Sequence, residues 1–531
     1  MTFVTANGTR GVVAAGHALT AEAGADMLRQ GGNAFDAAIS AAFTSCVLES
    51  TLTSLAGGGF LLAHTAAGDH RLFDFFCQTP QSKTIATASG GGPDFYPIHA
   101  NFGDTVQEFH IGLGSMAVPG MVAGLLRVHE SLGRLPLQTI VAPAQHWAIN
   151  GTVIDPFRAY CYQILEPILM ATPASRAIYA PNGKLLTAGE SFYLPDFAPL
   201  LGRLVTEGVD LFYRGPLAHQ LVQDCEAQGG YLRLGDLQTY RVIEREPLAL
   251  AYGEATVLTN PPPSSGGTLI AFALQLLGEV LPEVAQHGSA AHVAALRDVM
   301  ALSNLARQQG YDDYLYQPDI AEAFLGEAHT APYRQALKAR LAAQPVNKWG
   351  STTHISVIDG EGNAVSLTTS GGEGSSYVIP GTGIMVNNML GEEDLNPQGF
   401  HQWPLNQRIS SMMAPTIVLQ GGKPRLVLGS GGSNRIRTAI LQVVSNVIDF
   451  GLDLDAAVSA PRLHWERGAF HLEPGYDRVA LEALGIGAED DCTWWQTQNM
   501  FFGGVHAVAV DADGTLVGMG DRRRGGAWVR V

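Results

Sequence analysis

A Thr-Thr-His triplet at positions 352–354 is the feature that most constrains how this 531-residue chain can fold. It opens a strand-like stretch about two-thirds of the way along the sequence. A threonine hydroxyl is a poor nucleophile unless a base lies beside it, and one suitable base is the α-amine of the same threonine. That amine is free only if the chain is cut directly before it. The triplet also occurs in ordinary strands, but its placement predicts a precursor that cuts itself between Ser351 and Thr352.

The residues after the triplet predict a β-hairpin. Stretches 353–357 and 364–369 alternate in a strand-like way, and the glycine-rich segment 360–363 between them is typical of a turn. A two-residue turn in this segment pairs Thr353 with Ser370. The predicted hairpin therefore brings the Ser370 hydroxyl next to the start of the strand, where the new amine would lie.

Composition excludes several classes of protein. Hydrophobic residues make up 46% of the chain and charged residues 15%, which supplies a large core and argues against disorder. The net charge of −17 disfavours a nucleic acid or an anionic membrane as a partner. The five cysteines are scattered and form no Cys-x-x-Cys pair, so neither structural zinc nor a disulfide framework is expected. We predict no metal and no other cofactor.

The first ten residues lack the basic and apolar regions of a signal peptide. The longest apolar stretches, such as 38–48 and 268–277, are too short to span a bilayer. We therefore expect a cytoplasmic protein without a membrane-spanning segment.

Hydrophobic periodicity predicts helices and strands along the whole chain. Asn33 is suited to cap a helix over 34–48. Further helices are predicted over 19–30, 121–132, 143–150, 218–227, 269–277 and within 290–342, and strands over 60–64, 73–76, 248–252 and 425–428. Segment 344–350 has weak periodicity and is predicted to be an exposed tail before the cut. Helices that flank paired strand layers indicate an α/β sandwich.

A glycine turn at 429–433 follows the last of these strands and precedes a helix. The free N–H groups of Gly431 and Gly432 could bind the oxyanion of an acyl-transfer reaction. An ordinary strand-to-helix turn has the same pattern. A nucleotide-binding loop is disfavoured because the Gly-Lys-Ser/Thr ending is missing.

Ser410 and Ser411 stand directly before an apolar strand. Paired hydroxyls in this position could bind a carboxylate, and they are equally typical of a loop with local capping hydrogen bonds.

Short motifs along the chain occur in a recognisable order, at 31–38, 57–60, 118–120, 262–267, 352–354, 362–366, 382–384, 387–388, 410–412 and 429–432. Their order and spacing resemble the gamma-glutamyltranspeptidase family of N-terminal nucleophile hydrolases nearly from end to end. The resemblance implies a four-layer αββα sandwich and self-cleavage into a large subunit, 1–351, and a small subunit, 352–531. It also implies a covalent acyl-enzyme.

The resemblance implies a role for each matching residue. Thr352 looks like the nucleophile and Thr353 like the neighbouring hydroxyl. Ser370 takes the place of the second threonine, which hydrogen-bonds the amine of the nucleophile. Gly431 and Gly432 look like the oxyanion hole, and Ser410 and Ser411 look like the pair that binds the substrate carboxylate.

The residues that bind substrate in the family match less well. Phe76 stands where the family has its carboxylate-binding arginine, Gly372 replaces an asparagine and Met389 a glutamine, and the acidic residue is matched only by Glu392 or Glu393. Arg408 and Arg435 are the candidates for a replacement cation. A pocket with Phe76 and Met389 suits a less polar acyl group. The resemblance also extends to relatives within the superfamily, such as the cephalosporin acylases, which act on other amides.

Two classes of function follow. The first is an autoprocessed amide hydrolase or acyltransferase that moves a gamma-glutamyl or related acyl group from a small amide or peptide to water or an amine. Within this class, an acylase for a non-glutamyl acyl group is the alternative. The second class is a non-catalytic relative that keeps the fold as a scaffold, which the altered substrate positions favour and Thr352 opposes.

Overall fold

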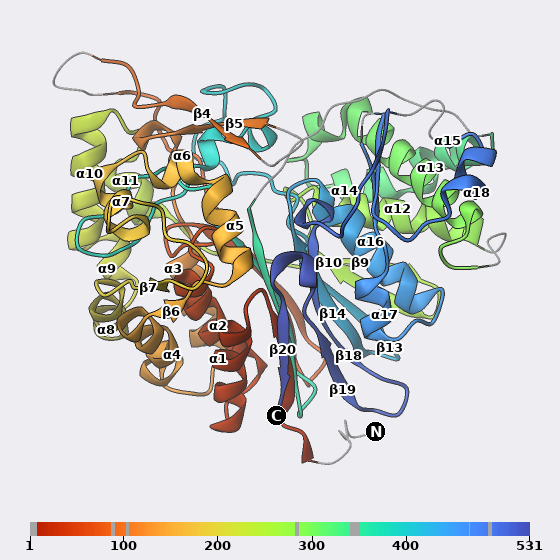
Figure 1. Cartoon of the computed structure of the whole chain (residues 1–531), viewed down its shortest axis with the longest axis horizontal. Coiled ribbons are helices and arrows are strands. Elements are labelled where there is room, and N and C mark those ends of the chain that lie inside the picture. The colour runs from red at the N-terminus through yellow and green to blue at the C-terminus, as the bar shows by residue number, and fades with distance from the viewer. Residues whose placement is uncertain are drawn as a thin grey trace.

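The computed structural model describes residues 8–85, 91–101, 106–281, 286–339, 351–466, 468–486 and 491–531. The predicted tail at 344–350 lies outside these residues. Two β-sheets occupy the centre of the molecule and helices cover the outer face of each (Figure 1). The four layers follow the order α, β, β, α, which confirms the predicted fold class.

The first sheet contains seven antiparallel strands, and Thr352 directly precedes one of its inner strands. In spatial order they are β20 (Ala527–Arg530), β1 (Gly11–Ala15), β11 (Thr353–Asp359), β12 (Ala364–Ser370), β2 (Gly58–His64), β3 (His70–Phe75) and β8 (Ile243–Arg245). Val13 and Ala15 on β1 face the helices, whereas Val12 and Ala14 belong to the core that includes the second sheet. Both faces of this sheet are therefore covered.

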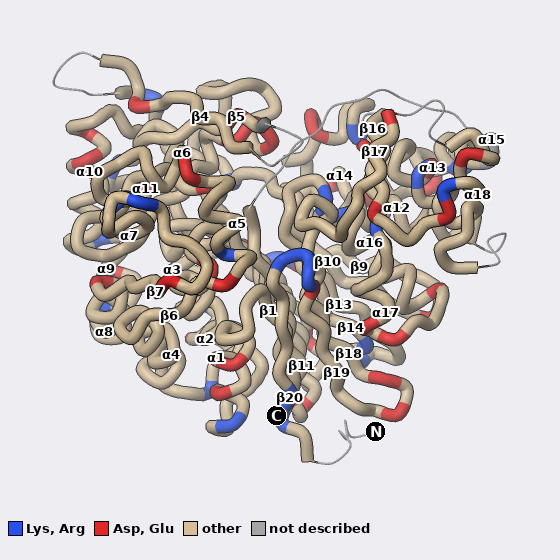
Figure 2. The backbone as a smooth tube through the Cα atoms, in the orientation of Figure 1, with Lys and Arg blue, Asp and Glu red and all other residues tan. Residues whose placement is uncertain are grey.

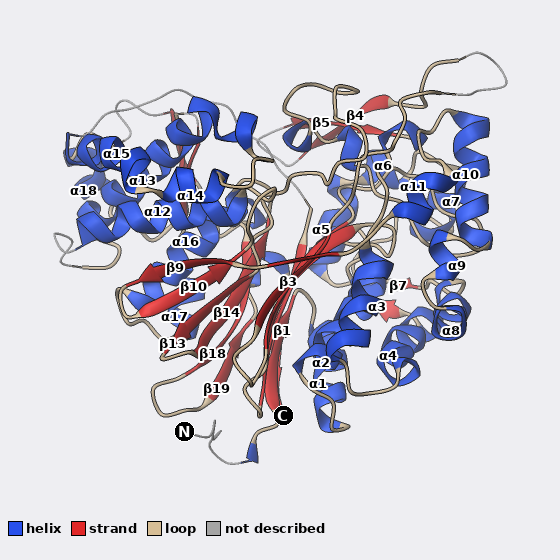
Figure 3. Ribbon diagram, turned by 180° about the vertical axis from the view of Figure 1, so that it is seen from behind, coloured by secondary structure: helices blue, strands red, loops and turns tan. Residues whose placement is uncertain are grey.

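The second sheet contains six antiparallel strands and packs against the first (Figure 3). In spatial order they are β19 (Leu516–Met519), β18 (Gly504–Val510), β14 (Lys423–Gly431), β13 (Thr416–Gln420), β10 (Ala255–Thr259) and β9 (Leu248–Tyr252). The contacts of β14 with β11 and β12 bring the glycine turn at its end close to Thr352.

Helices of opposite halves of the chain cover the two sheets. The first sheet is covered by α1 (Ala18–Arg29), α2 (Ala34–Leu48) and α3 (Met121–Leu132), and the second by α12 (Gly266–Val280), α16 (Arg435–Ile448) and α17 (Leu454–Ser459). Asn33 and Asp36 form a capping box at the start of α2, as the polar residue before an alanine-rich helix predicts. Every residue of α2 is buried.

The remaining helices extend the two outer layers. On the first-sheet side they are α4 (Leu137–Asn150), α5 (Pro156–Ile164), α6 (Glu166–Leu169), α7 (Pro173–Tyr179), α8 (Phe197–Glu207), α9 (Asp210–Tyr213), α10 (Pro216–Gln228) and α11 (Leu234–Thr239). On the other side they are α13 (Ala290–Ala306), α14 (Ile320–Leu325), α15 (Glu327–Ala339) and α18 (Arg478–Ala483). Acidic and basic positions are scattered over both halves (Figure 2).

The β11–β12 hairpin differs from the prediction by one residue. Thr353 pairs with Thr369, not with Ser370, and the loop contains three residues between Asp359 and Asn363. The Asp359 carboxylate accepts the N–H groups of Glu361 and Asn363, both at 2.9 Å, and thereby fixes the wider turn. Continued by one residue, this register sets Ser370 opposite Thr352 itself, on the same face of the sheet.

A buried cluster of charges anchors the turn that follows β19. Arg523 donates to the carboxylates of Glu473 and Asp521, and Arg462 lies 2.7 Å from the Asp521 carboxylate. Burial alone would raise the pKa of Asp521, but the charges of Arg462 and Arg523 lower it to about 2. The adjoining Arg524 reaches the carbonyl oxygen of Thr352 at 3.5 Å. The cluster therefore holds one wall of the region around Thr352.

We predict that Glu473→Ala lowers the free energy of unfolding by about 3–5 kcal/mol, because it leaves Arg523 buried without its main counter-ion. The measurement is the urea midpoint of the chain. Glu482→Ala is the control, since it removes an exposed partner of Arg478 and should change stability by about 1 kcal/mol or less. Equal effects of the two substitutions would contradict the prediction.

Candidate active site

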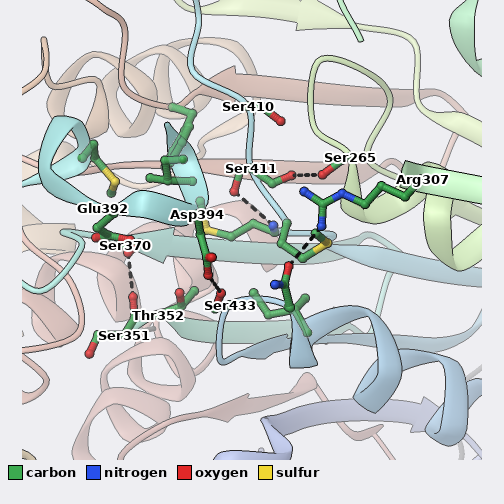
Figure 4. A pocket seen from close by; sticks show the side chains of 17 residues that line it. Ser265, Arg307, Ser351, Thr352, Ser370, Glu392, Asp394, Ser410, Ser411 and Ser433 are labelled. Carbon is green, nitrogen blue, oxygen red and sulfur yellow. Dashed lines mark hydrogen bonds between the residues drawn. The ribbon is translucent and has the colours of Figure 1, made fainter. Parts of the chain in front are cut away.

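A cavity of about 60 Å³ lies beside the uncut Ser351–Thr352 bond (Figure 4). The predicted residues that line it are Ser351, Thr352, Ser370, Phe76, Met389, Glu392, Ser410 and Ser411. Segments from 76 to 436 in the sequence thus meet at one cavity. The predicted residues Thr353, Gly372, Gly431 and Gly432 lie next to it without lining it.

The carbonyl group of Ser351 is held by Ser370. The Ser370 hydroxyl donates a 2.7 Å hydrogen bond to the Ser351 carbonyl oxygen and accepts one of 2.9 Å from the Gly372 N–H. A donor on a carbonyl oxygen stabilises the negative charge that develops there when a nucleophile attacks the carbon. In the uncut chain, Ser370 is therefore placed to assist attack at this peptide bond.

Glu373 holds the same residue from its other side. Its carboxylate accepts the Ser351 N–H at 2.7 Å and the Ser351 hydroxyl. The backbone of Glu373 is fixed in turn, because its N–H donates to the Asn388 side chain at 2.8 Å. Burial raises the pKa of Glu373, and the two hydrogen bonds from Ser351 oppose that rise.

The Thr352 hydroxyl has no side-chain base within hydrogen-bonding distance in the part of the chain that the structure describes. His354, two residues on, is buried between Thr368 and Ser356 and bonds both hydroxyls at 2.8 and 2.9 Å. Burial and the neighbouring His506 hold the pKa of His354 well below its usual range, so it is neutral. This histidine is part of the core, and the α-amine that a cut would release is the base available to Thr352.

Thr353 faces away from the cavity. Its hydroxyl donates to the Glu49 carboxylate, which also accepts the Thr20 hydroxyl at 2.7 Å. Gly16 packs so closely here that a Cβ would lie 2.2 Å from a Glu49 oxygen. This hydrogen bond therefore joins the start of β11 to the helical layer, on the face of the first sheet opposite to Thr352.

Gly431 packs against the backbone of Thr352, and Gly432 follows it beside Arg524. A Cβ on Gly431 would lie 2.1 Å from the Thr352 carbonyl oxygen, so no other residue fits there without a shift of the backbone. Gly432 has a φ of +123°, a conformation that side chains other than glycine rarely adopt. The next residue, Ser433, donates its hydroxyl to Asp394. The turn thus closes one side of the cavity.

The surroundings of Gly372 explain why the chain has glycine where the family that it resembles has asparagine. Its φ is +62°, and a Cβ here would lie 2.2 Å from both the Glu392 Oε1 and the Asn388 Oδ1 atoms. Glu392 therefore occupies the space of a side chain at position 372. Burial, followed by the charges of Glu373 and Asp394, raises the pKa of Glu392 well above its usual range. The raised pKa favours the uncharged form of Glu392, which is the weaker partner for an amine.

The position of the family's arginine is apolar. The Phe76 ring is buried and stacks on Phe60 at 5.4 Å. Neither predicted replacement cation lines the cavity. Arg408 donates to the carbonyl oxygens of Phe76 and Arg241, and Arg435 lies over the Phe501 ring at 4.5 Å.

Arg307 lines the cavity and was not predicted from the sequence. Among the described residues it is the only lysine or arginine in the lining. It lies where α13 ends in a distorted turn, and Figure 4 shows it on the far side of the cavity from Ser370 and Glu392. Its Nε donates to both Asp312 oxygens at 3.1 and 2.9 Å. Nothing at 307 distinguishes it in the sequence from other helical arginines.

Ser410 and Ser411 both line the cavity but lie in different surroundings. The Ser411 hydroxyl accepts the Met413 N–H at 3.0 Å, while its carbonyl oxygen accepts the Ser264 hydroxyl at 2.8 Å. Ser410 lines both this cavity and an adjoining one of about 270 Å³. Arg307 and Asp394 also line both, so the two cavities meet at these residues.

The described residues contain no group of three His, Cys, Asp or Glu side chains arranged to hold a metal ion. None of the described helices combines the length and the apolar character that crossing a bilayer requires.

Comparisons with known proteins agree with the geometry. A cephalosporin acylase from Bacillus halodurans superimposes with a TM-score of 0.85 at 25% identity, over 100% of this chain and 96% of that one. The four-layer fold is thus that of N-terminal nucleophile hydrolases. The gamma-glutamyltranspeptidase family model matches residues 20–531, and the chain belongs to this family of hydrolases and acyltransferases.

Two curated relatives represent both activities named within the family. The acylase ACY 1 proenzyme of Pseudomonas sp. (strain SE83) is 29% identical over 99% of this chain and 94% of its own length. The glutathione hydrolase proenzyme of Escherichia coli (strain K12) is 30% identical over 97% of this chain and 90% of its own. The chain is therefore an enzyme of this family, similar to members of both kinds.

We predict that Glu392→Gln stabilises the uncut chain at pH 8, tested in a Thr352→Ala background. A raised pKa means that the folded state binds this proton more tightly than the unfolded state, so stability falls as pH rises from the unfolded value of about 4.3 through the folded pKa. Glutamine does not titrate, so the Glu392→Gln variant should not lose this stability as pH rises. Melting temperatures measured from pH 4 to 8 should diverge as pH rises. The control is Glu393→Gln, at an exposed neighbouring position, and parallel curves for parent and Glu392→Gln would contradict the prediction.

Proposed function

We propose that this protein is a self-cutting amide hydrolase of the acylase type with Thr352 as its nucleophile. The observation that carries the proposal is the 2.7 Å hydrogen bond from Ser370 to the carbonyl oxygen of Ser351, at the bond to be cut. The names of both curated relatives, which are proenzymes, support it. The cut yields a large subunit, 1–351, and a small subunit, 352–531, from one precursor.

The cut begins when the Thr352 oxygen attacks the Ser351 carbonyl carbon. The carbonyl oxygen gains negative charge and is stabilised by the Ser370 hydroxyl. The C–N bond then breaks, the nitrogen takes the proton that the Thr352 hydroxyl gives up, and Ser351 is left as an ester on the Thr352 oxygen. Water hydrolyses this ester, which gives a carboxylate on Ser351 and restores the Thr352 hydroxyl beside its new α-amine.

In turnover the α-amine takes the proton of the Thr352 hydroxyl while the oxygen attacks the substrate amide carbon. The N–H groups of the Gly431-Gly432 turn stabilise the oxyanion. The leaving amine departs with the proton, and the acyl group stays on Thr352. Water, activated by the same α-amine, then releases the acid, or an acceptor amine takes the acyl group.

The cavity walls indicate which acyl group fits. Phe76 and Met389 supply an apolar wall, and Arg307 supplies a cation at the far side. The Arg307 Nη2 hydrogens have no acceptor among the described residues, so they are available to a carboxylate. An aliphatic acyl chain that ends in a carboxylate meets both features.

Transfer of a gamma-glutamyl group is the second candidate. The 30% identity to a glutathione hydrolase favours it, as does the presence of Glu392, Ser410 and Ser411 in the cavity. The raised pKa of Glu392, which favours its uncharged form, and the apolar Phe76 oppose it, because the glutamyl head carries both an ammonium and a carboxylate group.

We predict that the purified wild-type chain separates on a denaturing gel into fragments of about 37 and 19 kDa, since 351 of 531 residues precede the cut in a chain of 56.3 kDa. Thr352→Ala should remain one band. Ser370→Ala should slow the cut by about 10²–10³-fold, the usual effect of losing one oxyanion donor. The control is Ser375→Ala, whose hydroxyl bonds the Val386 carbonyl instead. Fragments of these sizes from Thr352→Ala would disprove the assignment.

A second prediction concerns substrates. Among p-nitroanilides, glutaryl should be hydrolysed with a higher kcat/KM than butyryl or gamma-glutamyl. Arg307→Gln should lower kcat/KM for the glutaryl compound by about 30-fold or more, as expected for losing one member of a buried charge pair, and should change the butyryl value little. The control is Arg297→Gln, on the helix α13 that precedes Arg307. A preference for the gamma-glutamyl compound would favour the second candidate, and a cut chain that hydrolyses no amide would favour a scaffold.

A further inference from the structure

Glu373 is a buried carboxylate that the mechanism above does not use. It lies three residues after β12, between Gly372 and Gly374, which have φ values of +62° and +87°. Both of its carboxylate oxygens bond Ser351, one through the N–H and one through the hydroxyl. Among the described residues, the hydrogen-bond donors to its carboxylate in the uncut chain therefore belong to the residue that the cut separates from Thr352.

The cut changes what surrounds this carboxylate. Consecutive Cα atoms are about 3.8 Å apart, so the Thr352 nitrogen lies within one residue of the Ser351 groups that Glu373 now binds. Once the peptide bond is broken, that nitrogen becomes an amine with hydrogens directed to the place that Ser351 occupied. Glu373 lies on one side of that place and the Ser370 hydroxyl on the other.

We propose that Glu373 changes partner when the chain is cut, and that its carboxylate holds Ser351 in the precursor and the Thr352 α-amine in the mature enzyme. Glu373 is then a positioning residue, since it acts on substrate only through the amine. This inference rests on the proposed function of Thr352 and extends it to the group that orients its base.

Charge gives the proposal a measurable consequence. A carboxylate beside an amine stabilises the ammonium form and raises the amine pKa. The other charged and titratable groups around Thr352 are Arg524, which reaches its carbonyl oxygen, and Glu392, Asp394 and Arg307, which line the cavity. Arg524 and Arg307 disfavour the ammonium, and among the acidic groups Glu373 is the one whose carboxylate oxygens already bond Ser351 beside the Thr352 nitrogen.

The test is the pH profile of kcat/KM for glutaryl-p-nitroanilide, whose rising limb reports the amine of the free enzyme. Glu373→Gln should move this limb to lower pH by about one unit or more, while Glu482→Gln, at an exposed position on α18, should leave it in place. The glutamine oxygen still accepts a hydrogen bond from Ser351, so the variant should still be cut. If Glu373→Gln stays uncut, the same test can be made with Glu373→Asp. Its carboxylate lies one methylene farther from the Thr352 amine, so a smaller shift of the rising limb is expected.

A second measurement does not require turnover. The rate at which acetic anhydride acetylates the Thr352 amine, read from the mass of the 352–531 fragment at several pH values, reports the amine pKa directly. An amine pKa lower in the variant supports the proposal. The same amine pKa in wild type and variant overturns it, whether or not any amide is hydrolysed. Failure of wild type to hydrolyse any amide would instead overturn the proposed function.

Discussion

The hydrogen bond between Ser370 and the Ser351 carbonyl depends on the register of the β11–β12 hairpin. A slip of one residue would turn Ser370 to the opposite face of the sheet. The register is fixed at the other end of the hairpin by Asp359, whose carboxylate accepts two N–H groups of its own turn and, at 2.9 Å, the Ala34 N–H at the start of α2. Asp359 thus links the hairpin turn to α2, and the hairpin register links this turn to the Ser351–Thr352 bond.

Glycines allow the elements around this bond to approach one another. A Cβ at Gly57 would lie 2.2 Å from the Ser370 carbonyl oxygen, and one at Gly431 would lie 2.1 Å from that of Thr352. These contacts come from opposite sheets. They bring backbone from both sheets against Ser370 and Thr352, the residues on either side of the Ser351 carbonyl. Donors that are already in place where charge develops stabilise the transition state without reorganisation during the reaction.

Much of this arrangement could be predicted from the sequence because local signals and tertiary packing agree. The helix predicted over 34–48 has the bounds of α2, and the strand over 248–252 those of β9. The hairpin register was wrong by one residue because the Asp359 side chain, not the backbone pattern, selects the turn. Arg307, Glu373 and Glu49 could not be found, since each is ordinary in its own segment and becomes distinctive only when distant segments meet at the cavity.

Glu392 and Asp394 line the cavity and Glu373 lies beside it, so the cut that we propose would change the charges around three acidic residues. In the uncut chain the Glu373 carboxylate accepts two hydrogen bonds from Ser351 and the Asp394 carboxylate one from Ser433, while the raised pKa of Glu392 favours its uncharged form. The proposed cut would add an ammonium on Thr352, which these acidic groups attract, and a carboxylate on Ser351, which they repel. The residues that hold the precursor would then also orient the new amine, and the charge on the severed end would favour its departure.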